Sequence, residues 1–357
     1  MTLRAGWRNE RTRPLRFFRH LHLAAALDCG AGGDRAGDSA VAAVKAPFPW
    51  FGGKSTVSDL VWSAFGDVRN YVEPFFGSGA VLLGRPEGFS GPETVNDRDA
   101  YLANFWRALQ HDPEGTAKWA DWPVNEVDLL ARHRWLVSSG AERLEALRAD
   151  PASFDARVAG YWVWGLCAWI GSGWCRQRGD GDQPKQLPHL GSAGMGINRK
   201  LPHLGDAGRG ERIADYFTSL AQRLRDVRVA CGEWDRVLGE SVTFKHGLTG
   251  IFLDPPYDAG EHDVQYSANS NVSAAVCEWA IANGNNQLMR IALCGYTEEH
   301  TLPESWACVP WKARGGYGSQ SDGRGRDNAD RERIWFSPHC IKPQNLVGLF
   351  DGLESAS

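Results

Sequence analysis

The chain has 357 residues, of which 43% are hydrophobic and 23% charged, enough for one large core and a smaller second domain. Its formal net charge of -4 excludes a protein that is basic over its whole surface, so any nucleic-acid contact has to be a local patch. The apolar stretch 161–170 is too short to cross a bilayer, and the eight cysteines form no zinc-like cluster. Composition therefore predicts a soluble cytoplasmic protein with reduced thiols, no membrane span and no metal site.

Residues 1–45 differ in composition from everything that follows. Six arginines precede the apolar segment 21–27, and a run of small residues comes after it. His22 interrupts the apolar segment and no convincing cleavage site follows, which argues against a targeting peptide. We interpret residues 1–45 as a flexible extension, or as the product of a start codon placed too far upstream. A nucleic-acid-binding arm is the alternative.

Ordered structure is expected to begin in the segment 47–55, PFPWFGGKS. The glycine pair allows the backbone to approach a ligand closely, and Ser55 is placed to cap the helix expected to follow it. Lys54 would then be a fixed cation beside that point, and Trp50 could lay its ring against a cationic ligand. The alternative is a Gly-Gly turn with a core tryptophan and a solvated lysine.

The next segment, 71–83, has the sequence YVEPFFGSGAVLL and predicts a strand, a glycine turn and a helix from Ser78. This unit is typical of nucleotide-binding α/β sheets, although the loop lacks the full G-x-G-x-x-G. A second strand, 93–95, then delivers Asp97 to the place where such sheets hold ribose hydroxyls with an acid. Asp97 could also cap the helix expected over 100–109, and the two roles can coexist.

The middle of the chain, about 119–225, is rich in tryptophan and then in glycine. A helix is expected over 155–169, where the tryptophan spacing favours core positions over base-stacking platforms. The glycine-rich part contains a repeat, LPHLGSAGMG at 187–196 and LPHLGDAGRG at 201–210.

Two interpretations of this stretch stay open, a duplicated surface loop and an arm that contacts DNA phosphates. His189 and His203 have no cysteine or carboxylate cluster to make a metal site with them. In the second interpretation the phosphate contacts are Arg176, Arg178, Arg199 and Lys200.

The segment 250–257, GIFLDPPY, predicts a buried parallel strand that stops at its carboxyl end, because proline cannot continue the ladder. It places a carboxylate, a carbonyl-bearing turn and an aromatic ring where α/β sheets bind ligands. Hydrogen bonds from an exocyclic amino group to Asp254 and to the Pro255 carbonyl would free the nitrogen lone pair for attack. Tyr257 offers a face for an extruded base. The alternative is an ordinary Pro-Pro turn after a capping Asp.

The carboxyl-terminal part predicts a helix over 272–282, a buried strand over 288–294 and an antiparallel pair formed by 306–311 and 332–336. The loop between the paired strands is long and glycine-rich, which indicates function or disorder. Beside a ligand cleft it would suit a phosphate clamp through Arg314 and Arg324.

Four of these segments, taken in order, resemble the Dam-like (D12 class, α-group) adenine-N6 DNA methyltransferases. They are PWFGGK at 49–54, EPFFGSG at 73–79, the Asn-Asp pair at 96–97 and DPPY at 254–257. The resemblance covers about 46–110 and 228–340. It implies an α/β fold, the Rossmann-like class I S-adenosylmethionine-dependent methyltransferase fold, with a mostly parallel sheet and an inserted, mainly helical target-recognition domain.

The resemblance also divides the chain. The methyltransferase domain would consist of 46–118, with the cofactor motifs, and 226–345, with the catalytic motif. The target-recognition insert would be 119–225, and 346–357 a tail.

The same resemblance implies S-adenosylmethionine as cofactor, double-stranded DNA as partner, and methylation of the N6 amino group of a flipped adenine. The segment 229–234, VACGEW, looks like the family's third-strand motif, with Glu233 where an Asp is more usual. The implied catalytic residues are Asp254, Pro255, Pro256 and Tyr257. The implied cofactor-binding residues are Trp50, Lys54, Phe75, Gly77, Ser78, Asp97, Glu233, Trp234 and Asp254.

Two other functions stay open from the sequence. Cytosine-N4 methylation uses a similar amine, but Asp at the first catalytic position, in place of the Ser common in that group, favours adenine. A catalytically silent DNA-binding relative is opposed by the intact Lys54, Asp97 and tetrapeptide. Direct displacement at a methyl group requires neither a metal nor a covalent enzyme intermediate.

Overall fold

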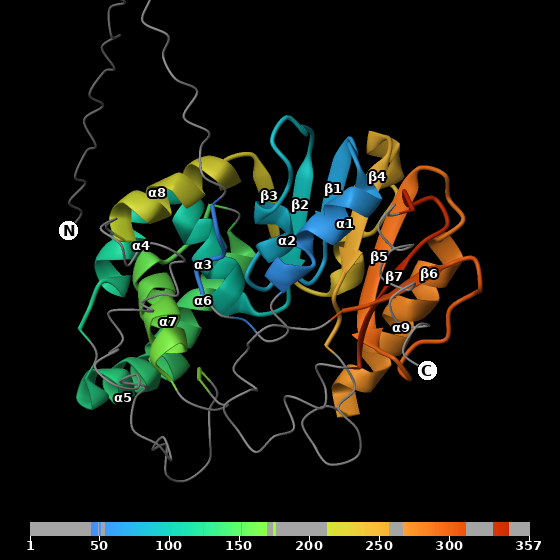
Figure 1. Cartoon of the computed structure of the whole chain (residues 1–357). Coiled ribbons are helices and arrows are strands. Elements are labelled where there is room, and N and C mark those ends of the chain that lie inside the picture. Colours follow the sequence, from blue (N-terminus) through green and yellow to red (C-terminus); the bar gives the residue numbers. More distant parts are fainter. Residues whose placement is uncertain are drawn as a thin grey trace, which may run out of the picture. The chain divides into compact units, whose positions relative to one another are not determined.

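A seven-stranded sheet, ordered β3-β2-β1-β4-β5-β7-β6, organises the described part of the chain (Figure 1). The computed structural model describes residues 44–48, 50, 54–123, 125–150, 152–169, 174–175, 213–256, 267–311 and 331–342. The strands from β3 to β5 are parallel, and β7 is antiparallel to both β5 and β6. The strands are β1 (Asn70–Glu73), β2 (Glu93–Asp97), β3 (Val227–Cys231), β4 (Thr249–Leu253), β5 (Met289–Tyr296), β6 (Ala307–Pro310) and β7 (Glu332–Phe336).

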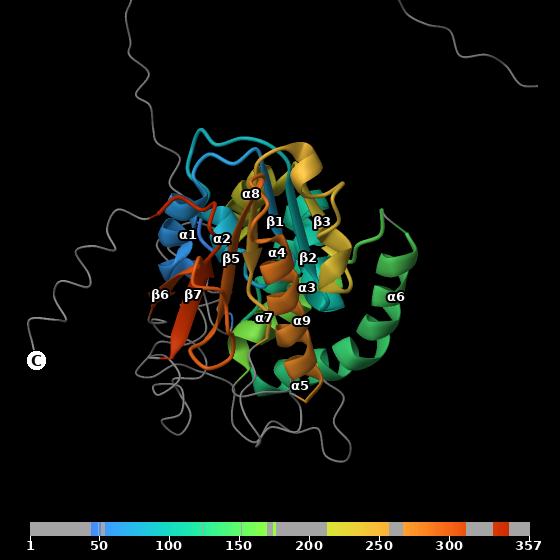
Figure 2. The same cartoon turned by 90° about the vertical axis from the view of Figure 1, so that its right-hand side faces the viewer.

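The predicted α/β class, the mostly parallel sheet and the final antiparallel pair are therefore confirmed. Helices cover both faces of the sheet: Figure 2 shows α1 and α2 on one side and α9 on the other. The α-helices are α1 (Ser58–Phe65), α2 (Ala80–Leu83), α3 (Ala100–His111), α4 (Pro113–Ala120), α5 (Glu126–Trp135), α6 (Ala141–Ala149), α7 (Ala156–Ala168), α8 (Ile213–Leu224) and α9 (Ser267–Asn283). Shorter helical turns are η1 (Lys54–Thr56), η2 (Leu136–Gly140, π-helical), η5 (Trp234–Val237) and η6 (Phe244–His246).

The strand order reverses at β1, which lies between β2 and β4. Val72 of β1 pairs with Thr94 on one side and with Ile251 on the other. In open α/β sheets the ligand crevice lies outside the carboxyl ends of the strands at such a switch point. The fold thus predicts the site to lie where β1, β2 and β4 end.

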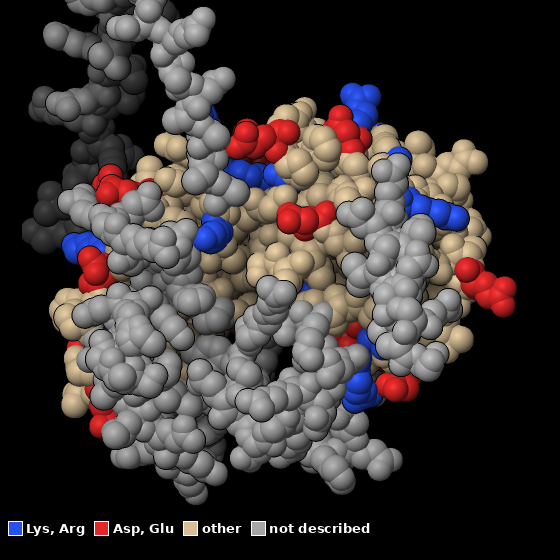
Figure 3. Space-filling model, viewed as in Figure 1, with Lys and Arg blue, Asp and Glu red and all other residues tan. Residues whose placement is uncertain are grey.

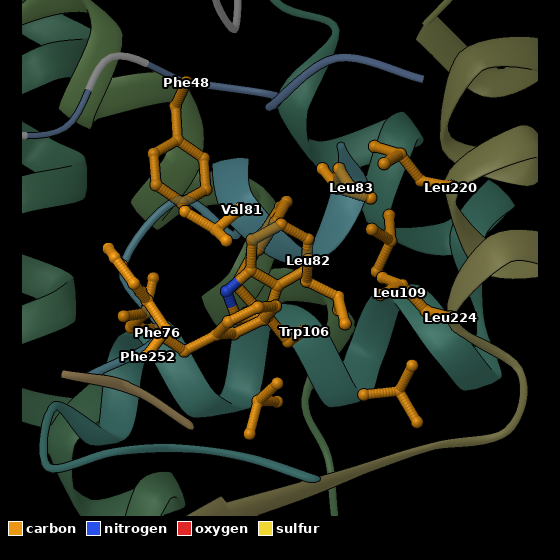
Figure 4. Close-up of a cluster of buried hydrophobic side chains, with 14 of the residues drawn as sticks. Phe48, Phe76, Val81, Leu82, Leu83, Trp106, Leu109, Leu220, Leu224 and Phe252 are labelled. Atoms are coloured by element: carbon orange, nitrogen blue, oxygen red, sulfur yellow. The ribbon is translucent and has the colours of Figure 1, made fainter. Parts of the chain in front are cut away.

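The helices of the middle segment share a core with the cofactor motifs. Figure 4 shows Trp106 of α3 among Val81 and Leu82 of α2, with Leu220 and Leu224 of α8 close by. Tryptophans 162, 164 and 169 of the middle segment are buried, which agrees with the core interpretation of their spacing. The apolar packing therefore holds α7 and α8 against the part of the sheet that carries the glycine loop.

Three local predictions are wrong. Ser55 caps no helix, because it lies exposed in η1 and α1 begins at Ser58 after an uncapped turn. The helix expected from Ser78 begins at Ala80, since Gly79 adopts a left-handed φ of 69° that completes the turn first. The cap of α3 is Asp99, whose carboxylate accepts from the amides of Tyr101 and Leu102, and not Asp97.

A buried acid ties the end of the middle segment to the sheet. Glu93 of β2 is paired with Arg85 at 2.9 Å and with Arg223 of α8 at 2.8 Å. Both guanidinium groups also donate to backbone carbonyls, Arg85 to Val68 and Arg223 to Leu82. Removing the shared carboxylate would leave two arginines without their acceptor in a low-dielectric region.

We predict that Glu93→Gln lowers the free energy of unfolding by about 3 kcal/mol, because it breaks a buried ion pair on one side only. Urea denaturation would measure the change. Glu240→Gln is the matched control, since Glu240 pairs with Lys245 at the surface, where a pair contributes about 0–1 kcal/mol. Equal effects of the two substitutions would contradict the structural role of Glu93.

Candidate active site

Asp254, directly after β4, forms a buried ion pair with Lys54. The Asp254 Oδ1 atom lies 2.9 Å from Lys54 Nζ, and the two side chains are 19% and 6% exposed. The ammonium group also lies 5.2 Å from the centre of the Trp311 ring. Burial acts to lower the pKa of Lys54, but the surrounding negative groups, Asp254 first, raise it above the ordinary value. The Lys54 side chain is therefore a charged partner of the carboxylate, and the solvated-lysine alternative is wrong.

The glycine loop after β1 is fixed by contacts of the amide, the carbonyl and the α-carbon of Gly77. Its amide donates to Asp97 Oδ2 at 3.1 Å, and its carbonyl accepts from Trp106 Nε1 at 3.1 Å. Its φ is 48°, and a Cβ atom there would meet the Trp50 ring at 2.7 Å. Only glycine fits this backbone and this close approach. The ring centres of Trp50 and Trp162 lie 6.3 Å apart, so helix α7 supports Trp50 from behind.

Asp97, at the end of β2, is a carboxylate held by backbone amides. Oδ2 accepts from Gly77, and Oδ1 accepts from the amide of Asp99 at 2.9 Å. Burial raises the pKa of Asp97 to about 7, against the opposing effect of these amides. A carboxylate in this environment gains from further hydrogen-bond donors, which is what two ribose hydroxyls would supply.

Two residues that sequence reasoning left without a role support these loops. The Asn96 amide group donates to the carbonyls of Pro74 and Gly232, at 3.1 and 3.0 Å, so it joins the turns after β1 and β3. Glu73 is 2% exposed and accepts from the Tyr71 hydroxyl at 2.8 Å. Burial raises the pKa of Glu73 well above its ordinary range. The role of Asn96 is not visible in the sequence, because its partners Pro74 and Gly232 are brought together only by the turns after β1 and β3.

Glu233 and Trp234, which follow β3, and Phe75, which follows β1, are the remaining predicted cofactor-binding residues. Phe75 and Trp234 stack with ring centres 6.4 Å apart and planes 22° apart. Glu233 pairs with Arg98 at 3.3 Å, and both side chains are more than half exposed. The structure thus brings Trp50, Gly77, Ser78 and Asp97 together at one loop, with Phe75, Glu233 and Trp234 at the neighbouring strand end.

Several predicted site residues lie outside the described residues. Pro255 is buried and Pro256 half-buried, but the description stops there. On the face in Figure 3, the described Lys and Arg side chains lie scattered among acidic ones, without a single basic patch. The predicted site residues outside the description are Tyr257 and the DNA contacts Arg176, Arg178, Arg199, Lys200, Arg314 and Arg324.

Within the described part of the chain, no group of His, Cys, Asp and Glu side chains is arranged to hold a metal ion. Within the same residues, no helix has the length and apolarity needed to cross a membrane.

A switch point with a glycine loop after β1, Asp97 at the end of β2 and Asp254 after β4 is typical of Rossmann-like α/β folds. Residues 50–125 match the family of D12 class N6 adenine-specific DNA methyltransferases. A search of curated proteins finds no match to the chain.

We predict energetic coupling between Lys54 and Asp254. Lys54→Met and Asp254→Asn each leave one buried group without its partner, so each lowers the free energy of unfolding by about 3 kcal/mol. The double variant loses less than the sum, because it leaves neither charge unpaired. Urea denaturation of the four proteins measures the coupling. The same cycle on the exposed pair Arg331 and Glu298 is the control, and additivity at Lys54 and Asp254 would contradict the pairing.

Asp97 predicts a pH dependence of stability. A carboxyl with a folded pKa of about 7 and an unfolded pKa of about 4 binds more protons in the folded state between those values. Asp97 therefore makes the free energy of unfolding fall as pH rises through this window. Asp97→Asn removes that contribution, so its stability changes less than that of the wild type between pH about 5 and about 8. An identical dependence in the two proteins would refute the assignment.

Proposed function

We propose that the protein transfers a methyl group from S-adenosylmethionine to N6 of an adenine extruded from double-stranded DNA. The observation that carries this proposal is the position of Asp254, which follows β4 at the switch point and is held there by Lys54. The D12 class match over residues 50–125 supports methylation of adenine, and we assign to Asp254 the role of receiving the amino nitrogen.

The residues around the glycine loop fit S-adenosylmethionine. Gly77 has no side chain, so the Trp50 ring packs directly against its backbone, and Asp97 offers acceptors for a ribose. The stacked pair Phe75 and Trp234 lies at the end of β3, where an adenine ring would find an aromatic surface. When bound, this cofactor would supply a methyl group attached to a positively charged sulfur, and the sulfur would keep the electron pair of the broken carbon–sulfur bond.

Asp254 and the Pro255 carbonyl would act on the amino group of the base. Each accepts one N–H of the amine, which draws the nitrogen toward tetrahedral geometry and frees its lone pair. A carboxylate has acceptor positions for more than one donor, so Asp254 can keep Lys54 while it binds the amine. The new bond joins N6 to the methyl carbon, and the surplus proton leaves N6 afterwards, so Asp254 need not be a strong base. Tyr257 is proposed to stack on the base.

The DNA itself would be held largely outside the sheet. We assign phosphate contacts to the basic side chains of 171–212 and 312–333, and target recognition to the insert 119–225 between the two parts of the methyltransferase domain. A DNA-modifying enzyme of this kind would work in the cytoplasm of a bacterial or phage-infected cell. The proposed contacts are Arg176, Arg178, Arg199, Lys200, Arg314 and Arg324.

We predict that Asp254→Ala lowers methyl transfer by at least about a hundredfold, because an interaction that strengthens in the transition state is lost. Transfer of labelled methyl groups to DNA measures this, and calorimetry with S-adenosylmethionine checks that the fold and cofactor site persist.

Two control variants sharpen the result. The double variant Lys54→Met/Asp254→Ala also removes the buried ammonium group, so it should recover stability without recovering transfer. Asp59→Ala, in the exposed first turn of α1, should leave transfer unchanged. Near-normal turnover in Asp254→Ala would refute the assignment.

A further inference from the structure

Trp311 lies at the same edge of the sheet as Asp254, on the side of β4 away from β1 and β2. Strands β5 and β6 are both antiparallel to β7, so β6 runs in the same direction as β4 and β5. The carboxyl end of β6 therefore lies on the same edge as Asp254, and Trp311 directly follows it. The glycine loop and Asp97 belong to β1 and β2, on the other side of β4.

The indole is tied to the catalytic carboxylate through one ammonium group. Lys54 Nζ is 5.2 Å from the Trp311 ring centre and 2.9 Å from Asp254 Oδ1. The backbone amide of Trp311 donates to the Glu332 carbonyl at 3.2 Å, which fixes the residue to the start of β7. The side chain is 9% exposed. Its position is therefore set by the sheet and by the same lysine that holds Asp254.

The Nε1–H group of Trp311 is buried and has no hydrogen-bond partner among the described residues. Other indole N–H groups of the described part donate to an acceptor. Examples are Trp62 to Val81, Trp106 to Gly77, Trp122 to Asp128, Trp164 to Trp122 and Trp174 to Trp162. A buried donor without a partner costs roughly 1–3 kcal/mol. A group left in this condition beside a catalytic carboxylate indicates a donor whose partner arrives with the substrate.

We propose that Trp311 is a base-binding residue, whose Nε1–H donates to a ring nitrogen next to the amino group of the extruded adenine. This inference rests on the proposed function. Adenine has an acceptor on each side of its amino group, N1 on the Watson–Crick edge and N7 on the major-groove edge. Asp254 accepts a hydrogen bond from the amino group, while Trp311 donates a hydrogen bond to the adjacent ring nitrogen. The pair thus matches the donor–acceptor pattern of one edge of the base.

The target sequence is first identified by mapping modified bases in plasmid DNA from cells that express the protein. The test then compares Trp311→Phe with the wild type on a duplex that carries this sequence. The target position holds adenine, 1-deazaadenine or 7-deazaadenine. We expect kcat/KM on adenine to fall about tenfold in the variant, with cofactor affinity unchanged. On one of the two deaza substrates the wild type falls to the level of the variant, and that substrate identifies the nitrogen.

Trp335→Phe is the matched control, because Trp335 lies on the neighbouring strand but packs on the opposite face of the sheet. If Trp311→Phe does not fold, replacing Trp311 by 3-benzothienylalanine keeps the shape of the indole and removes only the N–H. The inference is overturned if the variant and the wild type have the same kcat/KM on adenine, or if the kcat/KM of the variant is lower by the same factor on both deaza substrates. Loss of cofactor binding in the variant would also overturn it. A wild-type protein that methylates no DNA refutes the proposed function itself.

Discussion

The buried ion pair between Lys54 and Asp254 is the interaction on which the catalytic edge depends. It joins the first helical turn of the described fold, η1, to the end of β4, almost two hundred residues later in the chain. A carboxylate at a strand end in a low-dielectric crevice is unfavourable without a counter-charge, and an ammonium group buried to 6% exposure is equally so. Each therefore fixes the other.

The two halves of the sheet carry residues with different proposed roles. In the proposed function, the cofactor is bound by the glycine loop after β1, by Asp97 at the end of β2 and by the stacked pair Phe75 and Trp234. Asp254 and Trp311, which follow β4 and β6 and both contact Lys54, are proposed to bind the base. Asn96 links two of the cofactor turns by hydrogen bonds to both. The helical middle segment joins the same system, since Trp162 of α7 supports Trp50 and Arg223 of α8 holds Glu93 of β2.

The sequence predicted what depends on neighbours in the chain. The apolar run before Asp254 became β4, the two late strands became the antiparallel pair, and the helix expected over 155–169 became α7. What it could not predict depends on contacts between distant segments. Nothing around Lys54 shows that its partner is Asp254, and Trp311 resembles any other core tryptophan until the sheet order places it beside that lysine. Asp97 was considered as an alternative cap for the helix, but the cap is Asp99, which has the same side chain and is set apart only by its backbone conformation. The helical assignment at Ser78 failed for the same local reason, the left-handed Gly79.

The central claim is that Asp254, held by Lys54, directs methyl transfer to the amino group of adenine. The most direct test maps modified bases in plasmid DNA from cells that express the wild type or Asp254→Ala. The account predicts N6-methyladenine at one short sequence in the wild-type sample and none in the variant sample. N4-methylcytosine, or N6-methyladenine that persists in the variant, would contradict it.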